Sequence, residues 1–208
     1  MVIGILALQG AVEAHARHLT SLGVAVRPVR SPGDLAGLAA LVLPGGESTT
    51  ISMQLESSGL TEPLRRAIAE GLPVLGTCAG MILLATGIRD GRPDQIALAA
   101  LDIDVLRNGY GRQTASFETD LDLVPDGAEP SRAQRVHAVF IRAPRVTRVG
   151  PEVEILAVHD GHPVLVRQGS ILAASFHPEL TDDHAVHQML VAAAEHHMTR
   201  HANDLEEV

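Results

Sequence analysis

The first half of the chain alternates short apolar segments with amphipathic ones, and this alternation constrains the fold more than any other feature. Four apolar segments bounded by Gly and Pro are predicted strands, at residues 2–7, 24–29, 40–43 and 73–76. Segments with helical periodicity lie between and after them, at residues 12–22, 48–58, 61–70 and 79–86. Strands that alternate with helices predict βαβ units and therefore a parallel sheet.

The second half predicts added strands rather than further βαβ units. Asp160-Gly161 is a predicted hairpin turn. Thr61 and Thr181 are the expected N-caps of two helices, 61–70 and a closing helix at 181–199. Six further segments are predicted strands: 101–107, 114–121, 136–141, 153–158, 163–168 and 171–176.

Together these elements predict one α/β domain over residues 1–208. We expect an open, mostly parallel sheet flanked by helices on both faces, with added antiparallel strands in the second half. Aromatic residues make up only 2% of the chain, so Ala, Val, Leu and Ile must form the core, which suits such a sheet. The acidic end of the chain, from about residue 196 to 208, is expected to fray.

Charge and cysteine content exclude several classes of function. A net charge of −9 disfavours binding to nucleic acid. No apolar run is long enough to span a bilayer, and the N-terminus lacks the basic flank of a signal peptide. A single cysteine cannot form an internal disulfide, so we expect a protein of the reducing cytoplasm with neither nucleic acid nor membrane as partner.

That cysteine, Cys78, lies in the strongest local motif of the chain. Residues 76–80 read Gly-Thr-Cys-Ala-Gly, at the junction of a predicted strand and a predicted helix. This spacing is typical of a nucleophile elbow with Cys in place of Ser, where side chains at the two glycine positions would clash. The turn would present the sulfur at the carboxyl end of the sheet. The alternative is a buried cysteine packed as a small apolar residue.

A cysteine nucleophile needs a histidine base, which in turn needs an orienting carboxylate. His177 follows the predicted strand 171–176, and Glu179 lies two residues beyond it, so these two are the preferred base and orienter. The remaining histidines have no comparable setting. His197 and His201 have a spacing that suits a metal, but a solvated helix face is the preferred interpretation, and no metal site is predicted.

A second glycine motif follows the strand at residues 40–43. Gly45-Gly46 precede a helix start at which Ser48 or Thr49 is the expected cap. Free N–H groups in such a turn can bind a phosphate, a carboxylate or an oxyanion. A phosphate loop would carry a Lys here and this one does not, so we interpret it as an oxyanion and substrate loop. An ordinary strand-to-helix turn is the alternative.

Three segments in this order resemble the class I (triad) glutamine amidotransferases: 44–48 (Pro-Gly-Gly-Glu-Ser), 76–80, and 177–179 (His-Pro-Glu). The resemblance runs from about residue 2 to about residue 190. It is most specific for the glutaminase subunits of pyridoxal 5′-phosphate synthase, and implies a flavodoxin-like fold. Five further segments carry that narrower resemblance: Leu8–Val12, Arg107–Gln113, Ser116–Glu118, Phe140–Pro144 and Ser175–Thr181.

The resemblance implies hydrolysis of L-glutamine to L-glutamate and ammonia, with the ammonia passed to a partner synthase. Cys78 would attack the amide, His177 would transfer the proton and Glu179 would orient His177. The partner would be a (β/α)8-barrel subunit in a large ring complex, and the glutaminase step would need no metal or organic cofactor. Other positions matched to the family are glutamine-binding Gly46, Glu47, Ser48, Arg107, Ile141 and Arg142, oxyanion-hole Gly46 and Ala79, and partner-activated Gln9 and Gly10.

Three alternatives stay open at this point. The chain could serve another biosynthetic complex, such as imidazole glycerol phosphate synthase. It could be a stand-alone cysteine hydrolase, which would turn over without a partner. It could also be a catalytically silent docking subunit, although an intact set of Cys78, His177 and Glu179 argues against silence.

Overall fold

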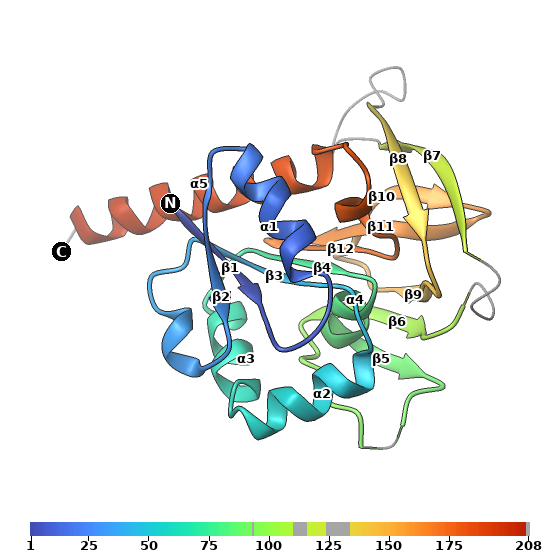
Figure 1. The fold of residues 1–208 in the computed structure, drawn as a ribbon, viewed down its shortest axis with the longest axis horizontal. Helices are drawn as coiled ribbons and strands as arrows, with labels where there is room; N and C mark the ends of the chain where they lie inside the picture. The colour runs from blue at the N-terminus through green and yellow to red at the C-terminus, as the bar shows by residue number, and fades with distance from the viewer. Residues whose placement is uncertain (93, 110–115, 124–133, 207–208) are drawn as a thin grey trace.

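The computed structural model describes residues 1–92, 94–109, 116–123 and 134–206, and a seven-stranded sheet lies at the centre of this described part (Figure 1). The strand order is β10-β11-β12-β4-β3-β1-β2. Strands β2, β1, β3, β4 and β12 are parallel, whereas β10 and β11 are antiparallel to their neighbours. The strands are β1 (Val2–Leu6), β2 (Ala25–Val29), β3 (Ala40–Leu43), β4 (Val74–Thr77), β10 (Glu154–His159), β11 (His162–Gln168) and β12 (Ile171–Ala174).

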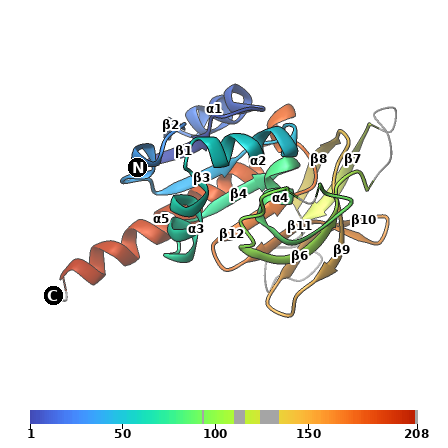
Figure 2. The same cartoon turned by 90° about the horizontal axis from the view of Figure 1, so that it is seen from below.

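Helices cover both faces of this sheet, as the sequence predicts (Figures 1 and 2). On one face α2, α3 and α4 pack against Leu41, Leu43 and Val74. On the other face α1 and α5 pack against Val42 and Leu75. Successive strand residues point to opposite faces, so a fully apolar strand such as β3 supplies both cores. The helices are α1 (Val12–Ser21), α2 (Ser48–Ser57), α3 (Thr61–Ala69), α4 (Ala79–Leu84) and α5 (Ala185–Glu206), with short 3₁₀ turns η1 (Pro32–Leu35) and η4 (Pro178–Leu180).

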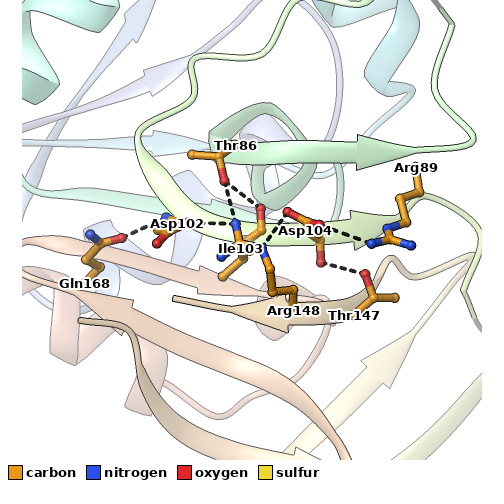
Figure 3. A network of polar contacts seen from close by, with 8 residues as sticks. All are labelled: Thr86, Arg89, Asp102, Ile103, Asp104, Thr147, Arg148 and Gln168. Carbon is orange, nitrogen blue, oxygen red and sulfur yellow. Dashed lines mark hydrogen bonds and ion pairs between the residues drawn. The ribbon is translucent and has the colours of Figure 1, made fainter. Parts of the chain in front are cut away.

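A small three-stranded sheet packs beside the face of the main sheet that α4 covers. Its strand order is β5-β6-β9, and its strands are β5 (Ala85–Arg89), β6 (Leu101–Leu106) and β9 (Arg145–Val149). Figure 3 shows the polar network on this sheet, in which Arg148 contacts Asp102 at 2.7 Å and Asp104 at 2.9 Å. The backbone N–H of Asp102 donates to the side chain of Gln168 on β11 at 2.8 Å, which ties the small sheet to the main one. Exposed ion pairs add little stability, so this network mainly fixes the position of β6.

A two-stranded hairpin, β7 (Phe117–Leu123) with β8 (Gln134–Phe140), packs beside the α5 face. Figures 1 and 2 both place it near β10, at the end of the molecule opposite the C-terminus. Phe140 stacks on Phe117 and also contacts Phe176, which directly follows β12. The three phenylalanines of the chain thus join the hairpin to the segment that leads to His177.

The predicted fold class is confirmed, and so is the Asp160-Gly161 turn, whose two residues have the positive φ angles (47° and 75°) that a two-residue hairpin turn requires. Two strands were missed. The predicted helix 79–86 ends at Leu84 and the chain continues as β5. Strand β9 was also missed, because only Val146 of its five residues is buried and the apolar signal is weak.

Both predicted threonine caps are wrong. Leu60 precedes α3 at the cap position, so Thr61 lies inside the first turn. The last helix begins at Ala185 rather than after Thr181, and the Asp183 carboxylate accepts the Ala185 N–H at 2.7 Å. The helix continues to Glu206, beyond the predicted end at 199, so fraying from residue 196 stays a prediction. The first residues of the predicted strand 114–121 lie outside the described residues.

Candidate active site

The nucleophile elbow predicted around Cys78 is present. Cys78 has φ 49° and ψ −102°, a conformation that L-residues rarely adopt, between the end of β4 and the start of α4. A Cβ on Gly80 would lie 2.0 Å from the Leu43 carbonyl oxygen, and one on Gly76 would lie 2.8 Å from the Gly80 backbone. Only glycine fits at either position, so the glycines of the motif are what allow the turn to form.

The proposed base reaches the same place from the end of β12. Strands β4 and β12 are parallel neighbours, and the Cys78 N–H donates to the Ala174 carbonyl at 2.8 Å, so the two strand ends are in register. The His177 N–H donates to Val139 of β8 at 2.8 Å, which anchors the segment after β12. The carboxyl ends of parallel strands share one edge of a sheet, and ligands bind at that edge in open α/β folds.

Cys78, His177 and Glu179 form one connected set. His177 Nδ1 is 2.8 Å from Glu179 Oε1, which leaves Nε2 of the ring for the Cys78 thiol, whose interaction with the ring raises the pKa of His177. The thiol also donates to the Ile141 carbonyl oxygen at 3.9 Å. All three residues are buried, with exposed fractions of 7%, 8% and 3% respectively. A thiol, an imidazole and a carboxylate joined in this order have the geometry of a catalytic triad.

The environment favours the charged forms of His177 and Glu179. Burial alone would lower the pKa of His177, but the hydrogen bonds to Cys78 and Glu179 outweigh burial and raise it to about 10. Burial likewise works to raise the pKa of Glu179, but the hydrogen bond from His177 outweighs it and lowers that pKa. His177 is therefore an imidazolium at neutral pH, and the Glu179 carboxylate beside it is ionised.

The glycine loop after β3 packs directly against the triad. A Cβ on Gly45 would lie 2.5 Å from Cε1 of His177, so only glycine permits this approach. Gln9, from the turn after β1, accepts the Glu47 N–H on its side-chain oxygen at 2.8 Å and lies against Gly46. Gln9 thus holds the loop in place beside the nucleophile.

The residue that caps α2 differs from the prediction. Glu47 is the N-cap, and its carboxylate accepts the N–H groups of Thr49 at 3.1 Å and Thr50 at 2.7 Å. Ser48 lies inside the helix. Burial works to raise the pKa of Glu47, but the hydrogen bonds from Thr50 and Thr49 outweigh it and lower that pKa to about 2. Glu47 therefore carries a negative charge at the mouth of the site.

A cavity of about 250 Å³ opens over the thiol, which is space for a molecule the size of a free amino acid. It holds a carboxylate from Glu47 and a guanidinium from Arg107, which are 3.3 Å apart. Arg142 has a positive φ of 47°, as Cys78 has, so two strained residues face one cavity. The lining residues are Gln9, Gly46, Glu47, Ser48, Cys78, Ile82, Arg107, Asn108, Ile141, Arg142 and His177.

All six residues matched to glutamine binding line this cavity, as do Cys78, His177 and Gln9. Gly10 and Ala79 do not line it. Gly10 packs on the Gly45 carbonyl beside the loop, and Ala79 is buried behind the nucleophile. Sequence reasoning missed Ile82, although it lies one helical turn after Cys78. Among the described residues, no group of three or more His, Cys, Asp or Glu is arranged to hold a metal ion.

A strained cysteine at a strand-to-helix turn, paired with histidine and glutamate over a small cavity, defines a triad cysteine hydrolase on an open α/β sheet. Among the described residues, no helix combines the length and apolar character needed to cross a bilayer. Comparisons with known proteins narrow this class.

The sequence profile of the SNO glutamine amidotransferase family matches residues 5–196. A pyridoxal 5′-phosphate synthase subunit PdxT from Frankia alni is 56% identical over 189 residues, covering 91% of this chain and 92% of that protein. A PdxT from Mycobacteroides abscessus is 53% identical over 191 residues, covering 91% and 95%. A solved structure described as a glutamine amidotransferase superposes with a TM-score of 0.85 at 45% identity, covering 94% of this chain and all of that one.

The chain therefore belongs to the SNO glutamine amidotransferase family. The resemblance inferred from the sequence motifs is confirmed, and the class I glutamine amidotransferase fold with it.

Proposed function

We propose that this chain hydrolyses L-glutamine to L-glutamate and ammonia and supplies the ammonia to a partner subunit for pyridoxal 5′-phosphate synthesis. The observation that carries the proposal is the joined set of Cys78, His177 and Glu179 over the cavity, in a chain whose relatives are named as pyridoxal 5′-phosphate synthase subunits.

The geometry supports a two-step mechanism. The Cys78 thiolate attacks the side-chain amide carbon of glutamine, and the C–N bond breaks as His177 gives its Nε2 proton to the departing nitrogen, so ammonia leaves and a thioester remains. Water, deprotonated by His177, then attacks the thioester, and glutamate leaves as the thiolate and imidazolium form again. Glu179 accepts the Nδ1–H of His177 and stabilises the imidazolium in both steps.

Binding and oxyanion roles follow from the cavity. Arg107 and Arg142 are suited to the carboxylate of an amino-acid substrate and Glu47 to its ammonium, with Gly46, Ser48 and Ile141 completing the wall. For the oxyanion of the tetrahedral intermediate we propose the backbone N–H groups of Gly46 and Ala79, which flank the nucleophile from the β3 loop and from the start of α4.

We further propose that the partner is a (β/α)8-barrel synthase subunit in a large ring complex, and that its docking against Gln9 and Gly10 completes the oxyanion hole. Glutamine would be wasted if the free subunit were active, and an incomplete oxyanion hole costs about 3 kcal/mol of transition-state stabilisation, which slows hydrolysis by about a hundredfold or more. A cytoplasmic location is proposed as well, since Cys78 must stay reduced to act.

The test is glutamate release from glutamine, measured with and without a purified pyridoxal 5′-phosphate synthase partner subunit. We expect slow release by the chain alone and release about a hundredfold faster with the partner. Equal turnover without any partner would instead identify a stand-alone hydrolase. Activation only by the synthase of another pathway, such as that of imidazole glycerol phosphate, would assign the chain to that complex.

Replacement of Gln9 by alanine should weaken activation more than folding. The side-chain oxygen that accepts the Glu47 N–H is lost, so the glycine loop is no longer held in place. We expect partner-stimulated glutamate release to fall about tenfold while the melting temperature changes by only a few degrees. Gln188→Ala, an exposed glutamine on α5, is the matched control. A large drop in melting temperature with unchanged activation would contradict this role of Gln9.

A further inference from the structure

Four histidines cluster behind the triad, between α1 and α5, and sequence analysis gave none of them a role. His15 and His18 lie on α1, His184 directly precedes α5 and His187 lies within it. His15 Nδ1 is 2.9 Å from His187 Nε2, and His18 Nδ1 is 2.8 Å from His184 Nδ1. The rings of His18 and His187 stack with centroids 4.4 Å apart. The cluster therefore continues from the interior to a second cavity, separate from the one over Cys78, whose lining includes His18 and His184.

The inner end of this cluster touches the catalytic apparatus. His15 is fully buried, and its Nε2 lies 3.4 Å from Glu179 Oε2 and 3.1 Å from Thr77 Oγ1. Thr77 directly precedes the nucleophile, and its hydroxyl accepts the Gly45 N–H at 3.0 Å. One imidazole nitrogen thus faces the orienting carboxylate, the strand that carries Cys78 and, through Thr77, the glycine loop.

His15 can donate only one hydrogen bond. Burial lowers the pKa of His15 to about 4 and that of His187 to about 2, so both rings are neutral at neutral pH and each carries one N–H. If His15 were protonated at Nδ1, its bare Nε2 lone pair would face the Glu179 carboxylate. His187 would then carry its N–H at Nδ1, which has no hydrogen-bond partner among the described residues. A buried N–H without an acceptor is costly.

The opposite tautomer removes both conflicts. With its proton on Nε2, His15 donates to Thr77 Oγ1 at 3.1 Å, and the same N–H lies beside Glu179 Oε2 instead of a bare lone pair. Its Nδ1 accepts the Nε2–H of His187. His187 Nδ1 then carries only a lone pair, and burying an unpaired lone pair costs less free energy than burying an unpaired N–H. Glu179 Oε2 has no hydrogen-bond partner among the described residues, because His177 takes Oε1, and the His15 Nε2 atom lies 3.4 Å from Oε2. A buried carboxylate needs donors at both oxygens.

We propose that His15 is a positioning residue of the triad, and that its Nε2–H, hydrogen-bonded to Thr77 and 3.4 Å from Oε2, keeps Glu179 correctly oriented. The triad is thereby extended to Cys78–His177–Glu179–His15. The other titratable groups near Glu179 are His18, His184 and His187 of the histidine cluster. Arg17 and Asp182 line the second cavity. The role of His15 in turnover rests on the proposed glutaminase function, but its tautomer and its hydrogen bond do not.

The direct measurement is nitrogen NMR of the histidine rings in the unmodified protein. Long-range ¹H–¹⁵N spectra distinguish the nitrogen that carries hydrogen from the bare one. We expect His15 to be neutral with hydrogen on Nε2 at pH 7. Hydrogen on Nδ1, or a charged ring, would overturn the proposal, and this result does not depend on any variant folding or on any activity.

Two variants distinguish a positioning role of the His15 side chain from a packing role. In His15→Gln the amide nitrogen can reach the place of Nε2, whereas in His15→Asn it lies level with Nδ1 and reaches only His187. With the partner present we expect H15N to lower kcat about tenfold with little change in KM, and H15Q to keep most of the wild-type rate. His184→Gln, at the outer end of the cluster, is the control and should behave as wild type.

A pH profile reports the state of Glu179 without any substrate. The ¹³C NMR shift of the Glu179 carboxyl group follows its ionisation directly. In H15N the carboxyl group loses a polar neighbour, so the midpoint of its titration should rise. In H15Q it should stay near wild type. Equal loss in both variants with an unmoved midpoint would show a packing role and overturn the proposal.

Should wild-type protein show no glutaminase activity with any partner, the proposed function fails. The titration of the Glu179 carboxyl group and the tautomer of His15 would still decide the proposal about His15.

Discussion

Replacement of Cys78 by alanine should abolish glutamine hydrolysis, with kcat lower by about 10⁴-fold or more, as loss of a triad nucleophile does elsewhere. No other described side chain that lines the cavity carries a thiol, so nothing else can form the thioester. His177 also changes state, because the hydrogen bond to Cys78 is the strongest of the effects that raise its pKa. Without Cys78, the effect of burial lowers the pKa of His177, so the imidazolium is less stable in this variant.

The fold should tolerate this change well. Alanine fits the space of the cysteine side chain and meets the same backbone demand at φ 49°, so no new strain arises. We expect a melting temperature within a few degrees of wild type and unchanged binding to the partner, measured by calorimetry and by titration. Cys78→Ser is a useful companion, since a hydroxyl of ordinary pKa is a poor nucleophile in the same place. Glutamine hydrolysis at the wild-type rate in C78A would refute the mechanism.

The parts of the site that the sequence predicted are those with local signals. Gly76 and Gly80 bracket Cys78 within five residues, and the clash that requires glycine there involves the adjoining strand and helix. His177 and Glu179 follow a strand whose apolar run is easily recognised. Since the carboxyl ends of parallel strands meet at one edge, predicting the strands was enough to bring the nucleophile and base together.

His15 shows what a sequence alone does not convey. Its role depends on a contact with His187, 172 residues away, and on the closure of α5 against α1. A histidine on an amphipathic helix is usually solvated, and nothing in the local pattern distinguishes a buried histidine from a solvated one.

The cap of α2 was missed for a different reason. Propensity favours Ser, Thr, Asp or Asn at that place, but Glu47 has the longer reach that lets two oxygens accept two N–H groups.

Replacement of Glu179 by glutamine should lower kcat by about 10³- to 10⁴-fold, the range seen when the carboxylate of a triad becomes an amide. The amide is nearly the same size, so packing changes little. It is uncharged, so it no longer stabilises the imidazolium, and its NH₂ group can face Nδ1 and force the ring into the wrong tautomer. The ring then carries its hydrogen on Nε2 and has no lone pair there to accept the proton of the Cys78 thiol, so the first step of the mechanism fails.

The sign of the pH effect follows from the two pKa shifts. In wild type the pKa of His177 is raised to about 10 and that of Glu179 is lowered, so the imidazolium and the carboxylate persist together across neutral pH. Without the Glu179 charge one of the effects that raise the pKa of His177 is lost. The midpoint of the His177 titration, read from its ring-nitrogen NMR shifts, should therefore move downward in E179Q.

A matched change elsewhere separates the triad from overall charge. Glu195→Gln removes the same unit of negative charge from an exposed position on α5 and should leave both kcat and the titration of His177 as in wild type. If E179Q lost less than about tenfold in kcat and kept the wild-type midpoint of the His177 titration, the imidazolium would not depend on this carboxylate. The hydrogen bond at 2.8 Å would then be structural, and the positioning role of His15, which acts only through Glu179, would lose its basis as well.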